Sequence, residues 1–149
     1  MDSSLKIETV RYCDRIADLR YIRTEVFQNE QGIASDLEFD GLDDDAIHLL
    51  AYLNGEAVAT ARLREIDRSS VKIERLAVLP EFRKRGIALQ LMQSALCLAS
   101  KQNKKSAVVH AQAYIAPLYK NLGFEIIGEE FSEADIPHVK MVKQLSPVN

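Results

Sequence analysis

The sequence contains no tryptophan, and its 149 residues include only two cysteines, four prolines and six glycines. Two cysteines are too few for a small protein that depends on several disulfide bonds. No apolar run approaches the roughly 20 residues that a membrane-spanning helix needs. The first residues show no basic segment followed by an apolar one, so we expect no secretory signal peptide and a cytoplasmic location. Lys and Arg number 19 against 22 Asp and Glu, a net charge of −3. This acidity argues against a nucleic-acid-binding surface.

The cysteines and histidines offer no pattern for metal or redox chemistry. Cys13 and Cys97 lie far apart, without the short spacing of a zinc site or a redox pair. Cys97 falls within an apolar helical run, so we expect its thiol to be buried. His48, His110 and His138 fall on separate predicted strands, where we expect satisfied rings. We therefore expect no bound metal.

What the sequence does have is the composition of a globular domain, with 47% hydrophobic and 28% charged residues. Its length fits one domain, residues 1–149, without an internal repeat or linker. Alternating apolar and polar residues predict a strand over 5–10, and apolar residues three and four apart predict a helix over 13–31. Asn54-Gly55 between two apolar runs predicts a hairpin of strands 47–53 and 57–63.

The second half of the chain alternates strands with helices. A third antiparallel strand over 71–79 is stopped by Pro80, which cannot donate a hydrogen bond to a sheet. The pattern then predicts a helix over 86–102, a strand over 106–111, a short helix over 116–122 and strands over 124–128 and 138–145. We expect a mixed α/β (α+β) sheet whose first four strands form mostly hairpins, while the later strand–helix–strand unit is parallel and right-handed.

A basic turn lies between the strand that Pro80 ends and the helix that follows. Arg83, Lys84 and Arg85 precede Gly86 there. Unpaired amides and the positive dipole end at a helix amino-terminus suit phosphate-like anions, and a glycine lets the backbone approach a ligand closely. The Walker and Rossmann glycine patterns are both missing. The turn is thus either an anion-binding site or a solvated basic turn.

Two segments resemble the GCN5-related N-acetyltransferase (GNAT) family. Arg83-x-x-Gly86-x-Ala88, after Leu76-Ala77-Val78-x-Pro80, is similar to the family's acetyl-CoA signature. The run from Tyr119 to Phe124 is similar to its second common signature, and the order of predicted elements matches the family across nearly the whole chain. A subgroup of small bacterial uncharacterised acetyltransferases shares Arg-x-x-Val-Phe-x-x-Glu-Gln, here Arg23 to Gln31, and Gly-Ile-Pro-His, here Asp135 to His138.

This resemblance implies a mostly antiparallel central sheet of six or seven strands flanked by about four helices. It also implies an N-acetyltransferase that moves acetyl from acetyl-CoA, its co-substrate, to a primary amine by direct attack in a ternary complex, without a metal. In the family, a strand's backbone holds the pantetheine arm and the amides of the basic turn hold the pyrophosphate. The matching residues here are Leu76, Ala77, Val78, Arg83, Lys84, Arg85, Gly86, Ile87 and Ala88. Gln112 stands where many relatives have a pantetheine-contacting asparagine, and a longer amide at that position leaves the contact open.

Amine attack on a thioester needs a base, because an alkyl amine of pKa about 10 is mostly protonated at neutral pH, and it benefits from an acid near the sulfur. Tyr119 matches the family's acid, the alternative being a packed tyrosine with a satisfied hydroxyl. Glu74 lies two residues before Leu76, on the same face if no bulge intervenes. As in some relatives, it is a candidate base. The alternative is a salt bridge with Arg62, Arg64 or Arg75.

The acceptor side is less defined. By resemblance, the end of the first helix lies over the acceptor cleft, so Phe27, Glu30 and Gln31 are candidates to shape the substrate pocket, the alternative being a core Phe27 and a solvated Glu30. Residues 35–45 hold six carboxylates. Their order fails the EF-hand pattern, so we expect a solvated loop, or one that attracts a cationic amine.

The family implies a small-molecule or peptide amine as acceptor, and a homodimer is common within it. Neither nucleic acid nor membrane is expected as a partner. Two alternatives stay open: a transferase that uses another acyl-CoA, and a non-catalytic sensor module that binds coenzyme A.

Overall fold

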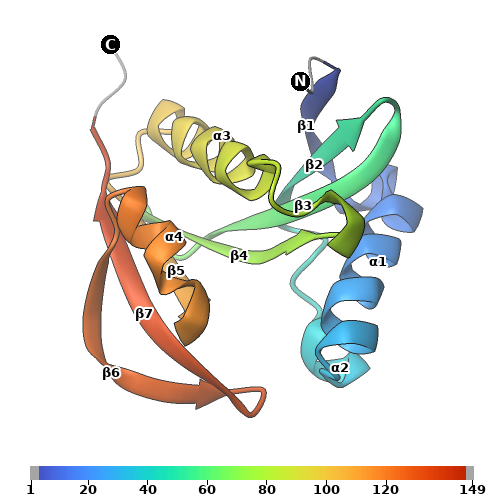
Figure 1. Cartoon of the computed structure of the whole chain (residues 1–149). Helices are drawn as coiled ribbons and strands as arrows, with labels where there is room; N and C mark the ends of the chain where they lie inside the picture. Colours follow the sequence, from blue (N-terminus) through green and yellow to red (C-terminus); the bar gives the residue numbers. More distant parts are fainter. Residues whose placement is uncertain (1–3, 147–149) are drawn as a thin grey trace.

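The computed structural model describes residues 4–146, which form a seven-stranded sheet in the order β1-β2-β3-β4-β5-β7-β6 (Figure 1). All neighbouring strands are antiparallel except β4 and β5, which are parallel. The strands are β1 (Leu5–Arg11), β2 (Ile47–Leu53), β3 (Glu56–Glu65), β4 (Ser70–Val78), β5 (Ser106–Gln112), β6 (Glu125–Glu133) and β7 (Ile136–Gln144). The helices are α1 (Ile16–Arg23), α2 (Ser35–Glu38), α3 (Ile87–Lys101) and α4 (Ala116–Asn121). The expected sheet and helix number are thus confirmed.

The β2–β3 hairpin shows why local sequence predicted this part well. Asn54 and Gly55 both have positive φ, 52° and 83°, as a tight turn between right-twisted strands requires. Four of the five predicted segments before the basic turn match β1 to β4 to within three residues. Among residues 4–146 no helix is long and apolar enough to cross a membrane.

The remaining predicted segment, one helix over 13–31, is built from three pieces. A short 3-10 turn η1 (Tyr12–Asp14) precedes α1, and α1 continues into a π-helical segment, η2 (Thr24–Glu30). The apolar spacing predicted the buried face of both helical pieces, since Leu19, Ile22 and Val26 are almost fully buried. It did not predict the change of winding.

Helices cover both faces of the first four strands (Figure 1). Leu49 and Ala51 belong to the cluster that contains the apolar face of α3, while Leu50 packs in the cluster of α1 and η2. Because alternate residues of a strand point to opposite faces, α3 and α1 lie on opposite sides of β2. Cys97 corrects an expectation: its side chain is exposed, because it lies on the outer side of α3, off the buried face.

The sheet splits between β4 and β5. These strands pair only where Ser70–Lys72 meets Ser106–Val108, although β4 continues to Val78 and β5 to Gln112. Arg75 has a φ of 56°, and the β3–β4 register shifts beside it, so a bulge turns β4 away from β5. The carboxyl-terminal part, β5-β7-β6, diverges from the first four strands in Figure 1. This divergence opens the site described next.

Candidate active site

A cleft of about 300 Å³ fills the split between β4 and β5. Six of the residues singled out from the sequence line it, and they come from η2 and the residue after it, and from β4, β5 and α4. They are Phe27, Gln31, Glu74, Leu76, Gln112 and Tyr119. The remaining predicted residues, Glu30, Ala77, Val78 and the turn 83–88, do not line the cleft itself. The fold therefore brings the candidate catalytic and substrate-binding residues together in one cleft, and the basic turn lies outside the cleft lining.

The edge of β4 that faces the cleft is available for hydrogen bonding. Beyond Lys72, no residue among those described pairs with β4 on its β5 side. Peptide groups at a strand edge seek partners, so an extended ligand can lie along Leu76–Val78 as a strand would. This geometry fits the pantetheine arm of coenzyme A.

The basic turn is exposed and ends in a left-handed glycine. Gly86 has a φ of 78° directly before Ile87, where α3 begins, and Lys84 has a φ of 65°. A Cβ added at Gly86 would meet nothing within 4 Å. The glycine is therefore required by backbone conformation and not by lack of space, and it stands directly before the first amides of α3. The fit to a pyrophosphate is good, because the amino-terminus of a helix coincides there with the exposed cationic residues Lys84 and Arg85.

Arg83 is held by Glu30. Its Nη1 and Nη2 each donate to a Glu30 carboxylate oxygen at 2.6 Å, and its Nε donates to the Val78 carbonyl at 2.9 Å. The hydrogen bond from Arg83 lowers the pKa of Glu30. Glu30 is thus neither a cleft-lining residue nor a merely solvated one. It ties η2 to the turn that precedes α3.

Tyr119 is buried on α4, with 7% of its surface exposed. Its ring packs edge-on against Phe124, with centroids 5.7 Å apart. Among residues 4–146 its hydroxyl has no hydrogen-bond partner, and Tyr119 lines the cleft. Burial raises the pKa of Tyr119 well above its usual value, so the phenol keeps its proton at neutral pH. This state suits a proton donor.

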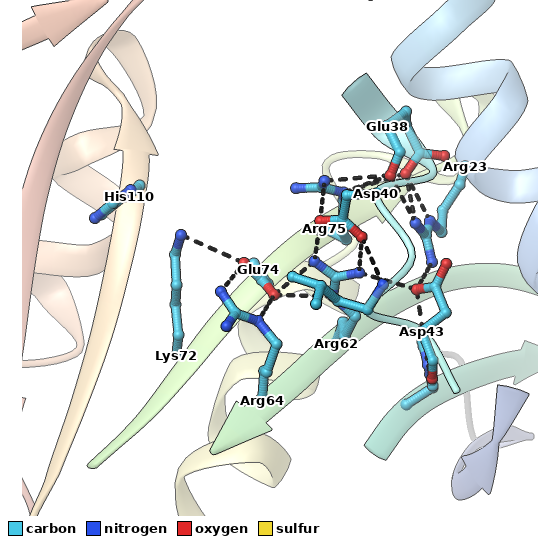
Figure 2. A network of polar contacts seen from close by, with 12 residues as sticks. Arg23, Glu38, Asp40, Asp43, Arg62, Arg64, Lys72, Glu74, Arg75 and His110 are labelled. Carbon is cyan, nitrogen blue, oxygen red and sulfur yellow. Dashed lines mark hydrogen bonds and ion pairs between the residues drawn. The ribbon is translucent and has the colours of Figure 1, made fainter. Parts of the chain in front are cut away.

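Glu74 is an ion-pair residue. Arg64 Nε donates to its carboxylate at 2.8 Å, Arg62 Nε donates at 2.9 Å, and Lys72 Nζ lies at 3.4 Å (Figure 2). Burial alone would raise the pKa of Glu74, but these three cations outweigh it and lower the pKa to about 2. The geometry matches the salt-bridge alternative for Arg62 and Arg64. The bulge at Arg75 also breaks the simple alternation that was to place Glu74 and Leu76 on one face.

The acidic segment 35–45 is solvated only in part, because Asp36, Asp44 and Asp45 are exposed whereas the other three carboxylates are paired. Glu38 and Asp43 are 2% and 6% exposed. Figure 2 shows them, with Asp40, in a network of arginines. Its contacts are Arg23 with Glu38 and Asp43 at 2.6 Å, Arg62 with Asp40 at 2.9 Å and Asp43 at 3.0 Å, and Arg75 with Glu38 and Asp40 at 3.1 Å. These carboxylates are neutralised, so they do not form a free anionic surface for an amine.

The comparison with known proteins decides the family. Residues 17–145 match the family described as "Acetyltransferase (GNAT) domain". The chain belongs to the GNAT acetyltransferase family. It is 31% identical over 131 residues to the Bacillus subtilis uncharacterized N-acetyltransferase YjcF, covering 87% of this chain and 93% of that one. The enzyme class expected from the resemblance, an acyl-CoA-dependent acetyltransferase, is confirmed.

Solved structures agree. An acyl-CoA N-acyltransferase from Pseudomonas aeruginosa superposes with a TM-score of 0.84 at 32% identity, over 93% of this chain and 99% of that one. Escherichia coli ElaA superposes with a TM-score of 0.82 at 28% identity, again over 93% and 99%. The mixed sheet of this acetyltransferase is therefore that of the GNAT fold.

The acetyltransferase also has a histidine pair that the sequence did not single out as a site. His110 Nδ1 lies 3.2 Å from one Glu133 oxygen, and His138 Nε2 lies 3.6 Å from the other. Phe131 packs against both rings. Apart from Phe131, these residues line the cleft. His138, in the segment Asp135 to His138, was the one member that the family resemblance pointed to as near the cleft. No local spacing connects β5, β6 and β7, and Glu133 lies beyond the predicted end of its strand, so the sequence offered no signal for the pairing.

Gln112 and Gln31 meet across the GNAT cleft. Gln112 Nε2 donates to Gln31 Oε1 at 2.9 Å, which joins the end of β5 to the residue that follows η2. The Gln112 amide thus already has one partner and keeps further hydrogen-bonding capacity for a ligand. Within residues 4–146, no group of three or more His, Cys, Asp or Glu has the arrangement to hold a metal ion.

Proposed function

We propose that residues 1–149 act as one domain that transfers acetyl from acetyl-CoA to the primary amine of a small molecule or peptide. The observation that carries this proposal is the unpaired edge of β4, which leads from the exposed start of α3 into a cleft that contains Tyr119. A long, extended thioester needs this combination: hydrogen bonds along its arm, amides for its phosphates and a closed end for its reactive group.

In this proposal coenzyme A binds along the border between β4 and α3. Backbone groups of Leu76, Ala77 and Val78 bond the pantetheine arm, and Gln112 reaches it from β5. The pyrophosphate lies on the first amides of α3. Those amides belong to the turn of Arg83, Lys84, Arg85, Gly86, Ile87 and Ala88. Gly86 supports this arrangement because it has no side chain and takes a left-handed conformation directly before the first residue of α3.

The amine then attacks the thioester directly. Its nitrogen forms the new bond to the carbonyl carbon, the carbon–sulfur bond breaks, and the sulfur takes the proton of the Tyr119 hydroxyl as coenzyme A leaves. The place of Tyr119 in the cleft supports this role, because its hydroxyl has no partner among the described residues and keeps its proton at neutral pH. The burial of Tyr119 against Phe124 fixes its orientation.

The proton of the attacking amine needs an acceptor. Glu74 was the candidate from sequence, but a carboxylate of pKa about 2 holds a proton poorly at neutral pH. We assign this step to His110. Glu133 Oε1 lies 3.2 Å from the Nδ1 of His110, so Nδ1 can donate its proton to Glu133 and Nε2 is left to accept the proton of the amine. Glu74 then serves to hold Arg62 and Arg64 in place.

The test is release of coenzyme A thiol from acetyl-CoA in the presence of a panel of amines, with the acetylated product identified by mass spectrometry. The proposal predicts thiol release that depends on the amine, with one acetyl group added per thiol. A chain that binds acetyl-CoA but releases no thiol with any amine would contradict it and favour a binding module. Faster release from a longer acyl-CoA would correct the donor.

A further inference from the structure

One wall of the cleft is cationic and is formed by Arg64, Lys72 and Arg75; we take the space between this wall and His110 as the acceptor end. All three line the cleft, and their side chains are 31%, 17% and 21% exposed. Figure 2 shows Lys72 reaching from β4 into the space before His110, which lies across the split on β5. A ligand in the acceptor end therefore meets these three side chains.

The cationic wall is not fully neutralised by its own carboxylates. Five cations, Arg23 and Arg62 together with the wall, share the four carboxylates Glu38, Asp40, Asp43 and Glu74. Arg23 and Arg62 are at most 1% exposed, so the uncompensated positive charge lies on the wall. Like charges repel more strongly in a partly desolvated cleft than in water, so a substrate with several amines is disfavoured there.

The wall also has hydrogen-bond donors to spare. Among residues 4–146, Nη1 of Arg64 and Nη1 of Arg75 have no partner, and Lys72 Nζ has only its long contact to Glu74 at 3.4 Å. Guanidinium and ammonium groups with open N–H bonds bind oxyanions well. Three such groups in one wall form a site for a carboxylate or a phosphate.

The opposite side of the cleft has the other sign. Glu133 is an exposed carboxylate, 45% exposed in its side chain, between His110 and His138. An ammonium group is therefore attracted toward the residue to which we assign the proton transfer. A molecule with an amine at one end and an anion at the other matches both walls.

We propose that the acceptor carries an oxyanion, a carboxylate or a phosphate, in addition to its amine, and that Lys72, Arg64 and Arg75 bind this group. The proposal rests on the proposed acetyl transfer and specifies its substrate class: amino acids, short peptides with a free carboxylate near the amine, or phosphorylated amines. The proposal excludes polyamines and amino sugars with several amines as preferred acceptors. Lys72 is the specificity-determining residue, because it has the fewest internal partners.

The first experiment measures binding without turnover. The protein saturated with coenzyme A is titrated with inorganic phosphate and, separately, with acetate, while backbone amide resonances are followed by NMR. We expect saturable shifts at residues 72–75. We also expect Lys72→Met, which keeps the length of the side chain, to weaken binding about tenfold, a typical loss for one charge-assisted contact. Lys101→Met, at the exposed end of α3, is the control. Absence of saturable shifts at 72–75, or equal affinity in Lys72→Met, would overturn the proposal.

The second experiment uses matched acceptors that differ only in the anion: 4-aminobutyrate against its amide, and glucosamine 6-phosphate against glucosamine. We expect the anionic member to have a kcat/KM about tenfold higher, and Lys72→Met to remove this preference through KM. A preference for the neutral members, or for spermidine, would overturn the proposal. A preference in only one pair identifies the oxyanion. If no amine is acetylated while phosphate still binds at 72–75, the proposed function fails and the anion site stands.

Discussion

Glu30 and Arg83 form a bidentate ion pair that joins segments 53 residues apart in the chain, with both N···O distances at 2.6 Å. The pair fixes the start of the basic turn against the end of η2. The family resemblance had placed Glu30 on the acceptor side of the site. Its partner instead places it beside the basic turn, which is the coenzyme A side in the proposed function.

We therefore predict that Glu30→Gln raises the KM for acetyl-CoA and leaves the KM for the amine nearly unchanged. The amide of glutamine loses one of the two charge-assisted bonds, a loss of about 1–2 kcal/mol at most for a half-exposed pair, so the turn is held less firmly. Initial rates with each substrate varied in turn measure both constants. Glu25→Gln, half-buried on the same segment and bonded to Asn29 rather than to the basic turn, is the control. A change confined to the amine KM would return Glu30 to the acceptor pocket.

Tyr119→Phe should lower kcat about tenfold or more and change acetyl-CoA binding little. The variant removes the proton donor but keeps the ring that packs against Phe124. Tyr114→Phe is a matched control, because Tyr114 lies in the short turn Ala113–Ile115 directly before α4 and is 73% exposed. Stopped-flow or steady-state thiol release gives kcat, and calorimetry gives the affinity for acetyl-CoA. Equal kcat in wild type and Tyr119→Phe would remove Tyr119 from the mechanism.

His110→Gln should lower kcat at pH 7 about a hundredfold, the lower part of the range for loss of a general base. The loss should shrink as the pH rises toward 10, because more of the amine is then deprotonated in solution. The pH dependence of kcat measures this recovery. His48→Gln is a control outside the cleft, provided that the variant folds by circular dichroism. A deficit that is the same at every pH would assign His110 a structural role.

Glu74→Gln should change stability more than the pH profile of the reaction. The pKa of Glu74 is about 2 in the folded protein and about 4.3 in an unfolded chain. Between these values the unfolded state binds more protons, so the stabilisation is complete above about pH 5 and is lost as the pH falls toward 2. The shift corresponds to about 3 kcal/mol at neutral pH.

Urea unfolding at several pH values checks this prediction. Glu74→Gln should unfold more easily at pH 7, by about 3 kcal/mol, and its stability should depend less on pH between 5 and 2. Glu129→Gln, on exposed β6, should leave both quantities unchanged. The acidic limb of the pH–rate profile should persist in Glu74→Gln. Loss of that limb would restore Glu74 as the base.

Local patterns predicted the elements because each depends on near neighbours. The hairpin follows from Asn54-Gly55, the stop of β4 from Pro80, and the start of α3 from Gly86. The parallel pairing of β4 with β5 follows from the helix that connects them. Tyr119 was singled out because the spacing of the second signature matches a known family, and the residue does line the cleft; its role stays a prediction.

Long-range partners could not be predicted in the same way. Glu38 and Asp43 look like surface carboxylates in the sequence, and only folding brings Arg23 and Arg62 onto them. Burying such groups is costly unless they are paired, so their exposure depends on residues elsewhere in the chain. The meeting of His110 with Glu133 has the same origin, because three strands must assemble before it exists.

The central claim is direct transfer from acetyl-CoA to an amine while both are bound. The most direct measurement is the initial rate with acetyl-CoA and one acetylated amine varied together, combined with the intact mass of protein incubated with acetyl-CoA alone. The account predicts intersecting double-reciprocal lines and no acetyl group on the protein. Parallel lines together with a stoichiometric acetyl-enzyme would contradict it.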